Sequence, residues 1–293
     1  MRYTLRQLQV FLATAHHENI SRAADELAMS QSAASGSLKE LEQQFDVQLF
    51  DRVGKRLQLS ELGRELRPEA EKLQAQALAF ESALGGAQTP GSLRIGATLT
   101  IGNYLAVPLI AAFRAQHAGA DISLHVANTS EIAAMVADFQ LDVGMIEGEI
   151  NHPRLLTRPW REDELQVFCA PDHPFAGKRS VSDARLSEAQ WIVREPGSGT
   201  RQTFDRAMHG ILSDLKISME LQHTEAIKRA VEAGLGLGCL SRISLKDAFA
   251  RGSLVPVQVP QRDFSRQLNL ISHRDKFHSA ALEEWLSLCA QHN

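Results

Sequence analysis

The chain has 293 residues, 44% of them hydrophobic and 23% charged, which is typical of a soluble globular protein with two or three domains. Its formal net charge of −4 excludes a strongly basic nucleic-acid binder, so any DNA contact depends on where the cations are placed. No apolar run is long enough to span a bilayer, and no signal-peptide pattern or metal-type cysteine spacing is present. We therefore expect a cytoplasmic protein with reduced thiols and no metal site.

The first 49 residues carry three helical patterns. Residues 4–17 have apolar side chains at steps of three and four, which predicts an amphipathic helix. Residues 20–27 and 34–45 repeat this spacing on either side of a short turn, and Ser30 lies where an N-cap is expected. Short polar side chains on the last of these helices would fit a DNA major groove. The pattern favours a helix-turn-helix, although from these residues alone an ordinary helical hairpin remains open.

A basic hairpin follows the helices. In residues 50–60, Gly54 supplies a turn, and Lys55 and Arg56 lie at its tip. We expect this wing to contact phosphates beside the recognition helix, whereas the alternative is a solvated basic turn.

Residues 61–84 then alternate apolar steps of four and three, which indicates a long helix with a coiled-coil seam. The seam residues predicted to contact a second copy of the chain are Leu66, Leu73 and Phe80. The glycine-rich residues 85–91 predict a flexible hinge.

Beyond the hinge, strands alternate with helices, so the fold class is α/β with a mostly parallel sheet. A first unit has strands expected at 93–97, 122–127 and 143–146 and helices at 102–117 and 130–139. A second unit has strands expected at 165–170, 191–193, 217–221, 237–240 and 255–259 and helices at 200–212 and 225–233. Residues 267–271 look like a strand that returns to the first unit, before a C-terminal helix at 279–290.

Six short motifs occur in order within the first 63 residues. They are Leu5-Arg6-Gln7-Leu8-Gln9-Val10-Phe11, Ser21-Arg22-Ala23-Ala24, Ser30-Gln31-Ser32-Ala33, Leu41-Glu42, Leu49-Phe50-Asp51-Arg52 and Leu59-Ser60-Glu61-Leu62-Gly63. This series resembles the DNA-binding domain of LysR-type transcriptional regulators, and the resemblance extends more loosely over the full length. It implies a homodimer or homotetramer, joined by antiparallel linker helices, that binds double-stranded promoter DNA and a small effector. It also implies a second domain of two lobes joined by two crossovers, similar to periplasmic binding proteins.

The resemblance and the residue patterns together divide the chain into three parts. Residues 1–60 are the expected winged helix-turn-helix domain, and residues 61–91 are the linker helix and hinge. Residues 92–293 are the expected effector-binding domain, with lobe I at about 92–163 and 266–293 and lobe II at about 164–265. The predicted DNA contacts are Arg22, Gln31, Ser32, Ser35, Lys39, Arg52, Lys55 and Arg56.

In open α/β sheets a ligand lies beyond the carboxyl ends of the strands, where helices begin and backbone N–H groups are free. The run Arg194–Arg201 has two glycines and two hydroxyls there, and Arg201 offers a forked donor for an oxyanion. The alternative is a glycine-rich turn with capping residues. The predicted effector-binding residues are Thr98, Thr100, Thr129, Ser130, Glu147, Ser198, Gly199, Thr200 and Arg201.

The run 194–201 looks like that of the LysR branch containing regulators of inorganic sulfur metabolism and of the carbon-fixation operon. This resemblance implies a small anionic effector: sulfite, sulfate, a sulfonate, or a phosphorylated or carboxylated metabolite. Nearby Glu147, Glu195 and Glu225 leave open whether the ligand also carries an amine or hydroxyls. We expect no other cofactor.

Enzyme motifs are incomplete, so we predict no catalytic residues. Ser213-Asp214-Leu215-Lys216 lacks its companion motifs, and the glycines of residues 234–238 follow a helix rather than a strand. Two rival functions remain: a solute-binding protein or enzyme derived from the two-lobed fold, and a constitutive DNA-binding protein whose second domain only oligomerises. The patterns do not identify the effector, the target genes, or whether the protein activates or represses.

Overall fold

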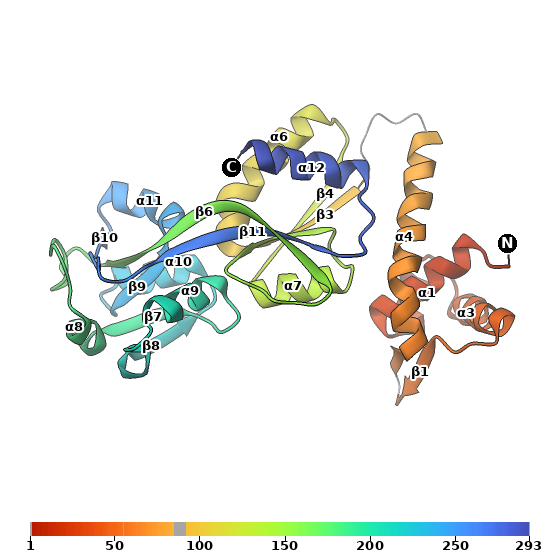
Figure 1. The fold of residues 1–293 in the computed structure, drawn as a ribbon, viewed down its shortest axis with the longest axis horizontal. Coiled ribbons are helices and arrows are strands. Elements are labelled where there is room, and N and C mark those ends of the chain that lie inside the picture. The colour runs from red at the N-terminus through yellow and green to blue at the C-terminus, as the bar shows by residue number, and fades with distance from the viewer. Residues whose placement is uncertain (1, 55, 85–91, 293) are drawn as a thin grey trace.

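The computed structural model describes residues 2–54, 56–84 and 92–292. Lys55 and the predicted hinge at 85–91 lie outside these residues. Figure 1 shows three bodies in a row: the N-terminal domain with its long helix, a central lobe and a distal lobe. None of the described helices is long and apolar enough to cross a membrane.

The N-terminal domain is a winged helix-turn-helix. Its elements are α1 (Leu5–His17), α2 (Ile20–Glu26), α3 (Gln31–Phe45), β1 (Phe50–Val53) and β2 (Arg56–Leu59). Ser30 caps α3 by accepting a hydrogen bond from the N–H of Ala33 at 3.2 Å, as its place in the sequence predicts. Phe11 of α1 packs edge-on against Phe50 of β1, with ring centroids 5.7 Å apart. This contact joins the wing to the helical core.

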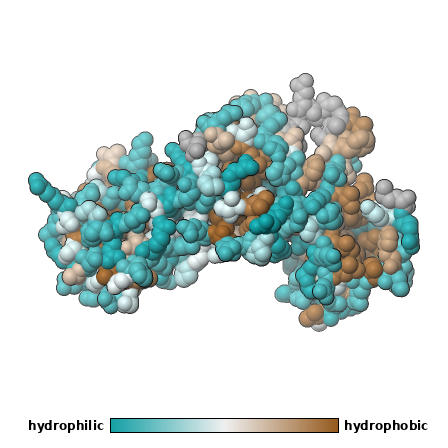
Figure 2. Space-filling view, in the orientation of Figure 1, coloured by the Kyte–Doolittle hydropathy of each residue, from teal (hydrophilic) through white to brown (hydrophobic). Residues whose placement is uncertain are grey.

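The linker helix α4 runs from Glu61 to Leu84, the predicted range. Ala70 is buried against the N-terminal domain, whereas Leu66, Leu73 and Phe80 are 42%, 41% and 65% exposed. Figure 2 shows apolar surface near the free end of this helix. The seam predicted from the sequence is therefore solvent-exposed in the single chain.

Lobe I is built on three parallel strands. Its elements are β3 (Ser92–Thr98), α5 (Leu99–Ile101), the π-helix η1 (Gly102–Ala106), α6 (Val107–Gln116), β4 (Asp121–Ala127), α7 (Thr129–Ala137), β5 (Val143–Glu147) and α12 (Ala280–Gln291). Strand β3 pairs in parallel with β4 and β5. The core lies around Trp285 and Phe113, whose ring centroids are 6.0 Å apart.

Lobe II repeats the plan. Its elements are α8 (Asp183–Glu188), β7 (Gln190–Arg194), α9 (Gly199–Ala207), the 3-10 helix η2 (Leu212–Asp214), β8 (Lys216–Leu221), α10 (Thr224–Glu232), β9 (Leu237–Ser241), α11 (Arg242–Arg251) and β10 (Val255–Pro256). Strand β7 pairs in parallel with β8 and β9. Trp191 and Phe204 lie at the centre of this core, with ring centroids 5.1 Å apart.

Two long strands join the lobes: β6 (Leu155–Cys169) and β11 (Ser265–His273). They pair antiparallel with each other, while β11 also pairs with β5 and β6 with β9. The strand order is β4-β3-β5-β11-β6-β9-β7-β8, with β10 paired to β6. The predicted return of the chain to lobe I at residues 267–271 is thereby confirmed.

Several sequence expectations need correction. The helix expected at 102–117 is divided into η1 and α6, and α5 precedes it. The helix expected at 200–212 ends at Ala207, the strand expected at 255–259 ends at Pro256, and α8 was not predicted. Strand β6 begins ten residues before its predicted start, because residues 155–164 cross between the lobes with mixed exposure and lack a buried run. Helix α11 was missed because it follows β9 directly, with Ser241 both ending the strand and capping the helix through the N–H of Ile243 at 3.2 Å.

Candidate functional site

The outer face of α3 carries the predicted DNA contacts. Buried Ala34, Leu38 and Leu41 fix the helix on the domain core. The side chains on its other face, together with those of α2 and the wing, are exposed: Arg22, Gln31, Ser32, Ser35, Lys39, Arg52 and Arg56. Each is thus accessible to a DNA groove or backbone, and among the described residues the carboxylate paired with Arg56 is that of Glu18, at 3.9 Å.

Between the lobes, the buried carboxylate of Glu147 lies at the end of β5. It accepts hydrogen bonds from the hydroxyls of Thr98 and Thr200 at 2.9 and 2.8 Å, and from the backbone N–H of Thr100 at 2.9 Å. The guanidinium of Arg266 lies 2.8 Å away. Four donors from both lobes and from a crossover strand therefore surround one oxyanion that belongs to the protein.

The electrostatics of this cluster favour the ionised form of Glu147. Burial by itself raises the pKa of that carboxyl. Arg266 and the hydrogen bonds of Thr200 and Thr100 outweigh burial and lower the pKa to about 2. At neutral pH the site therefore holds a fixed negative charge.

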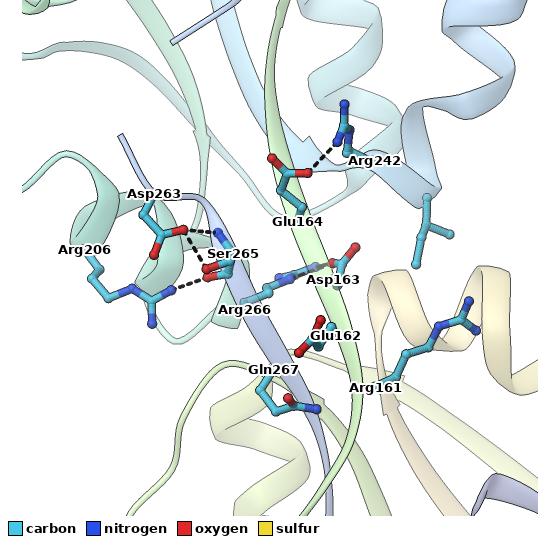
Figure 3. Close-up of a pocket in the computed structure, with 11 residues that line it drawn as sticks. Arg161, Glu162, Asp163, Glu164, Arg206, Arg242, Asp263, Ser265, Arg266 and Gln267 are labelled. Carbon is cyan, nitrogen blue, oxygen red and sulfur yellow. Dashed lines mark hydrogen bonds and ion pairs between the residues drawn. The ribbon is translucent and has the colours of Figure 1, made fainter. Parts of the chain in front are cut away.

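Arg266 also neutralises a second carboxylate. Figure 3 shows its side chain reaching from β11 to Asp163 on β6, at 2.7 Å. Ser241 at the end of β9 donates to the same carboxylate at 2.8 Å. The crossover cavity beside them, about 880 Å³, is lined by arginines and carboxylates in equal number, several of them paired, so we place no ligand there.

A separate cavity of about 410 Å³ lies where the N-termini of α7 and α9 meet. It gathers five of the nine predicted effector residues: Thr129, Ser130, Ser198, Gly199 and Arg201. The other four, Thr98, Thr100, Glu147 and Thr200, are not among its lining residues. This differs from the single cluster expected from the sequence. The hydroxyls of Thr98 and Thr200 and the N–H of Thr100 already donate to the Glu147 carboxylate.

The two lobes touch directly at this cavity. The N–H groups of Ser130 and Gly199 donate across the gap to Gly197 O and Thr129 Oγ1, both at 3.2 Å. Gln202 also pairs with the backbone of Glu149 in both directions. A Cβ on Gly199 would lie 1.8 Å from the carbonyl oxygen of Glu147, so only glycine permits this approach. The lobes are closed at this edge.

Arg201 does not present the open fork expected from the sequence. Its Nε donates to Asp205 at 2.8 Å, and its Nη1 donates to Glu220 at 2.6 Å and to the carbonyl of Arg194 at 3.0 Å. The hydroxyl of Thr129 is similarly engaged, since it donates to the carbonyl of Glu147 at 2.8 Å and accepts from Gly199. Ser198 is different: it is the N-cap of α9, yet its side chain makes no capping hydrogen bond.

The three glutamates left open by the sequence differ in position. Glu147 faces the centre of the lobe junction. Glu195 pairs with Arg194 at 2.7 Å, and Glu225 pairs with Lys228 and lies 3.3 Å from the hydroxyl of Tyr104. Sequence reasoning missed Arg266 and Gln202. The available signal for Arg266 was a charged residue directly before a predicted strand.

Comparisons with known proteins agree with this architecture. Residues 5–64 match the family model "Bacterial regulatory helix-turn-helix protein, lysR family", and residues 86–293 match "LysR substrate binding domain". The chain is 43% identical to the uncharacterized HTH-type transcriptional regulator YeiE of Escherichia coli (strain K12) over 289 residues, covering 99% of this chain and 98% of that protein.

Two further similarities concern the effector domain and the family branch. The chain is 35% identical to the RuBisCO operon transcriptional regulator of Allochromatium vinosum over 280 residues, covering 94% of this chain and 92% of that protein. The solved CcmR regulatory domain of Synechocystis PCC6803, in complex with 2-PG, superposes with a TM-score of 0.64 at 27% identity, covering 69% of this chain and 96% of that chain.

Proposed function

The chain belongs to the LysR family of transcriptional regulators, and we propose that a small anion in the cavity between α7 and α9 is the effector that controls it. It is a DNA-binding regulator with an effector-binding domain, and it is not an enzyme. The relative from Allochromatium vinosum agrees with the resemblance to carbon-fixation regulators.

The observation that carries the proposal is the N-terminus of α9, where Thr129 Oγ1 accepts from the N–H of Gly199 but Ser198 provides no side-chain cap. A helix leaves its first N–H groups without intrahelical acceptors, and the side chain of Ser198 does not cap them. The N-terminus of α7 meets α9 at the same cavity, so two partial positive charges converge there. The carboxylates at the rim are paired with arginines: Asp205 with Arg201 at 2.8 Å, an arginine that it shares with Glu220, and Glu149 with Arg206 at 3.5 Å.

A solved structure also supports the proposal. The CcmR regulatory domain was obtained in complex with 2-PG, and its fold matches 69% of this chain. The neighbouring Glu147 carboxylate, whose pKa is about 2, already accepts hydrogen bonds from Thr98, Thr100 and Thr200 and pairs with Arg266. The effector's own charge then has to lie outside that cluster, beside Ser130 and Ser198.

We assign sequence specificity to the exposed face of α3 and non-specific affinity to the wing. Gln31, Ser32, Ser35 and Lys39 are suited to base edges in the major groove, and Arg22, Arg52, Lys55 and Arg56 to phosphates. Since the net charge of the whole chain is −4, dimerisation would double these cationic contacts.

We further propose that α4 forms the dimer interface. Leu66, Leu73 and Phe80 form the exposed seam described above, and burying such a stripe against a second copy is favourable. Pairing of dimers into a homotetramer would need a second contact, through the effector domains.

A thermal-shift experiment tests the effector assignment. Sulfite, sulfate and 2-PG are added to the full chain, and at least one of them should raise the melting temperature of the wild type. Ser198→Ala, which removes a hydroxyl that caps nothing, should reduce this shift, while Ser213→Ala, on the exposed surface outside the cavity, should not. If none of the anions stabilises the wild type, the protein is a constitutive DNA-binding protein or its effector is not of this class.

A further inference from the structure

A second polar cavity lies between the DNA-binding domain and lobe I. It has a volume of about 730 Å³. One wall comes from α1, β2 and α4, and the other from residues 138–140, 154 and 273. The two walls are already in contact, because Arg67 of α4 donates to the carbonyl of Asp138, and Lys72 lies 3.5 Å from Asp275.

His273, which lines this cavity, carries a buried ring nitrogen without a hydrogen-bond partner among the described residues. His273 is 2% exposed, and its Nδ1 accepts a hydrogen bond from the N–H of Asp275 at 3.1 Å. In the neutral ring the proton is therefore on Nε2. That atom has no hydrogen-bond partner among the described residues, and neither has the buried Nε of Arg67. Such orphaned donors are costly unless a ligand or water accepts from them.

The cavity has more cationic than anionic groups. Arg64, Arg67 and Arg154 line it, against the carboxylates of Glu18 and Asp138. Asp138 already faces Arg154 at 3.4 Å, and Glu18 faces Arg56 of the wing at 3.9 Å. The Nε of Arg67 lies 3.7 Å from the carboxylate of Glu71. Arg64 is therefore the one guanidinium of the cavity without a carboxylate partner among the described residues, and it adds to the imidazole donor.

Both histidines of the cavity have a lowered pKa. Burial lowers the pKa of His273 to about 4, with Arg154, Lys276 and Arg67 adding to this and Asp275 opposing it. Burial also lowers the pKa of His16, aided by His17 and opposed by Glu26. A ring surrounded by guanidinium groups resists a further positive charge, which is the environment that an anion would complement.

We propose that this cavity is a second binding site, separate from the interlobe cavity, for a small oxyanion of the phosphate or sulfate type. The oxygens of such an anion accept from His273 Nε2 and from the guanidinium groups of Arg154 and Arg67. Because Arg67 belongs to the linker helix and His273 to lobe I, the anion binds only while both walls are in place. Its binding therefore favours the docked arrangement of the DNA-binding domain on lobe I.

Isothermal titration of the full chain with inorganic phosphate, sulfate and glucose 6-phosphate tests the site. We expect saturable binding of at least one of these, with inorganic phosphate and the phosphate ester distinguishing a free ion from a phosphorylated metabolite. Arg154→Gln removes a half-exposed guanidinium and should weaken binding about tenfold. His273→Phe keeps a ring against Phe139 and removes the donor, with a similar expected loss.

Two controls separate this site from the others. Arg158→Gln changes an exposed arginine on β6 outside the cavity, and Ser198→Ala changes the interlobe cavity; both should bind phosphate like the wild type. The proposal is overturned if none of the three anions binds saturably, or if Arg154→Gln and His273→Phe bind as tightly as the wild type. Loss of binding in Ser198→Ala alone would also overturn it and would place the anion between the lobes, which leaves the proposed function intact.

Discussion

The carboxylate of Glu147 lies 2.8 Å from the guanidinium of Arg266, and both side chains are 1% exposed. These residues are 119 positions apart in the sequence. Glu147 ends a strand of lobe I, while Arg266 begins the strand that returns from lobe II. The pair therefore holds the crossover and the lobe edge together, and its disruption should affect the whole effector domain.

Glu147→Gln should destabilise the protein by about 3 kcal/mol, because it leaves the buried Arg266 with one carboxylate fewer. Urea unfolding of the full chain measures the loss. Glu149→Gln, whose side chain is 81% exposed, is the matched control and should change the free energy of unfolding by less than about 0.5 kcal/mol. Equal stability of the two variants would show that the buried pair does not contribute.

His273 should make the folded protein less stable at acidic pH, whereas a histidine paired with a carboxylate would make it more stable there. Its pKa is lowered to about 4 in the folded chain from 6.5, so between these values the unfolded chain binds more protons. Stability contributed by the neutral ring is therefore complete above pH 6.5 and is lost as the pH falls toward 4.

Urea midpoints measured from about pH 7.5 down to about pH 4.5 check this expectation, because this range begins above the unfolded-state pKa of 6.5 and ends just above the folded-state pKa of about 4. The wild type should lose stability toward acid, and His273→Phe should lose less. The control His209→Phe, at an exposed histidine, should follow the wild type. An unchanged acid loss in His273→Phe would exclude this ring as its source.

Arg56→Ala should weaken binding to all DNA sequences alike, since the side chain is exposed at the wing and suited to a phosphate. The salt dependence of the binding constant should fall by about one unit of slope. Fluorescence anisotropy at several salt concentrations measures both. Arg179→Ala, at an exposed position in lobe II, should leave both unchanged; a loss confined to one promoter would assign Arg56 to base recognition instead.

Replacing Leu73 and Phe80 with aspartate should dissociate the proposed dimer, because it places charges in the exposed seam of α4. Light scattering should report a smaller mass than for the wild type, with the fold of each subunit retained. Gln76→Asp, an exposed polar position on the same helix, should keep the wild-type mass. An unchanged mass in the double variant would show that other surfaces hold the subunits together.

Much of the fold was predictable because it depends on local patterns. The seam periodicity fixed both ends of α4, and the N-cap at Ser30 fixed the start of α3. Only the last third of strand β6 was predicted, since residues 155–164 have mixed exposure and lack a continuous apolar pattern.

The candidate site was less predictable, because it depends on contacts between distant segments. The sequence places Thr98, Glu147 and Thr200 at strand or helix ends, which is correct. It does not indicate that Glu147 accepts the hydrogen bonds of these donors, because its partner Arg266 belongs to no motif. The division into a filled buried cluster and an open cavity at Ser130 and Ser198 became visible only in the structure.

The central claim is that an anion at the α7–α9 cavity controls binding to promoter DNA, and a DNA-binding assay with the stabilising anion tests it most directly. The wild type should change its promoter affinity or footprint when that anion is added. The double variant Ser130→Ala with Ser198→Ala should bind the promoter like the ligand-free wild type and should not respond. A full response to the anion in this variant would place the effector elsewhere and contradict the assignment.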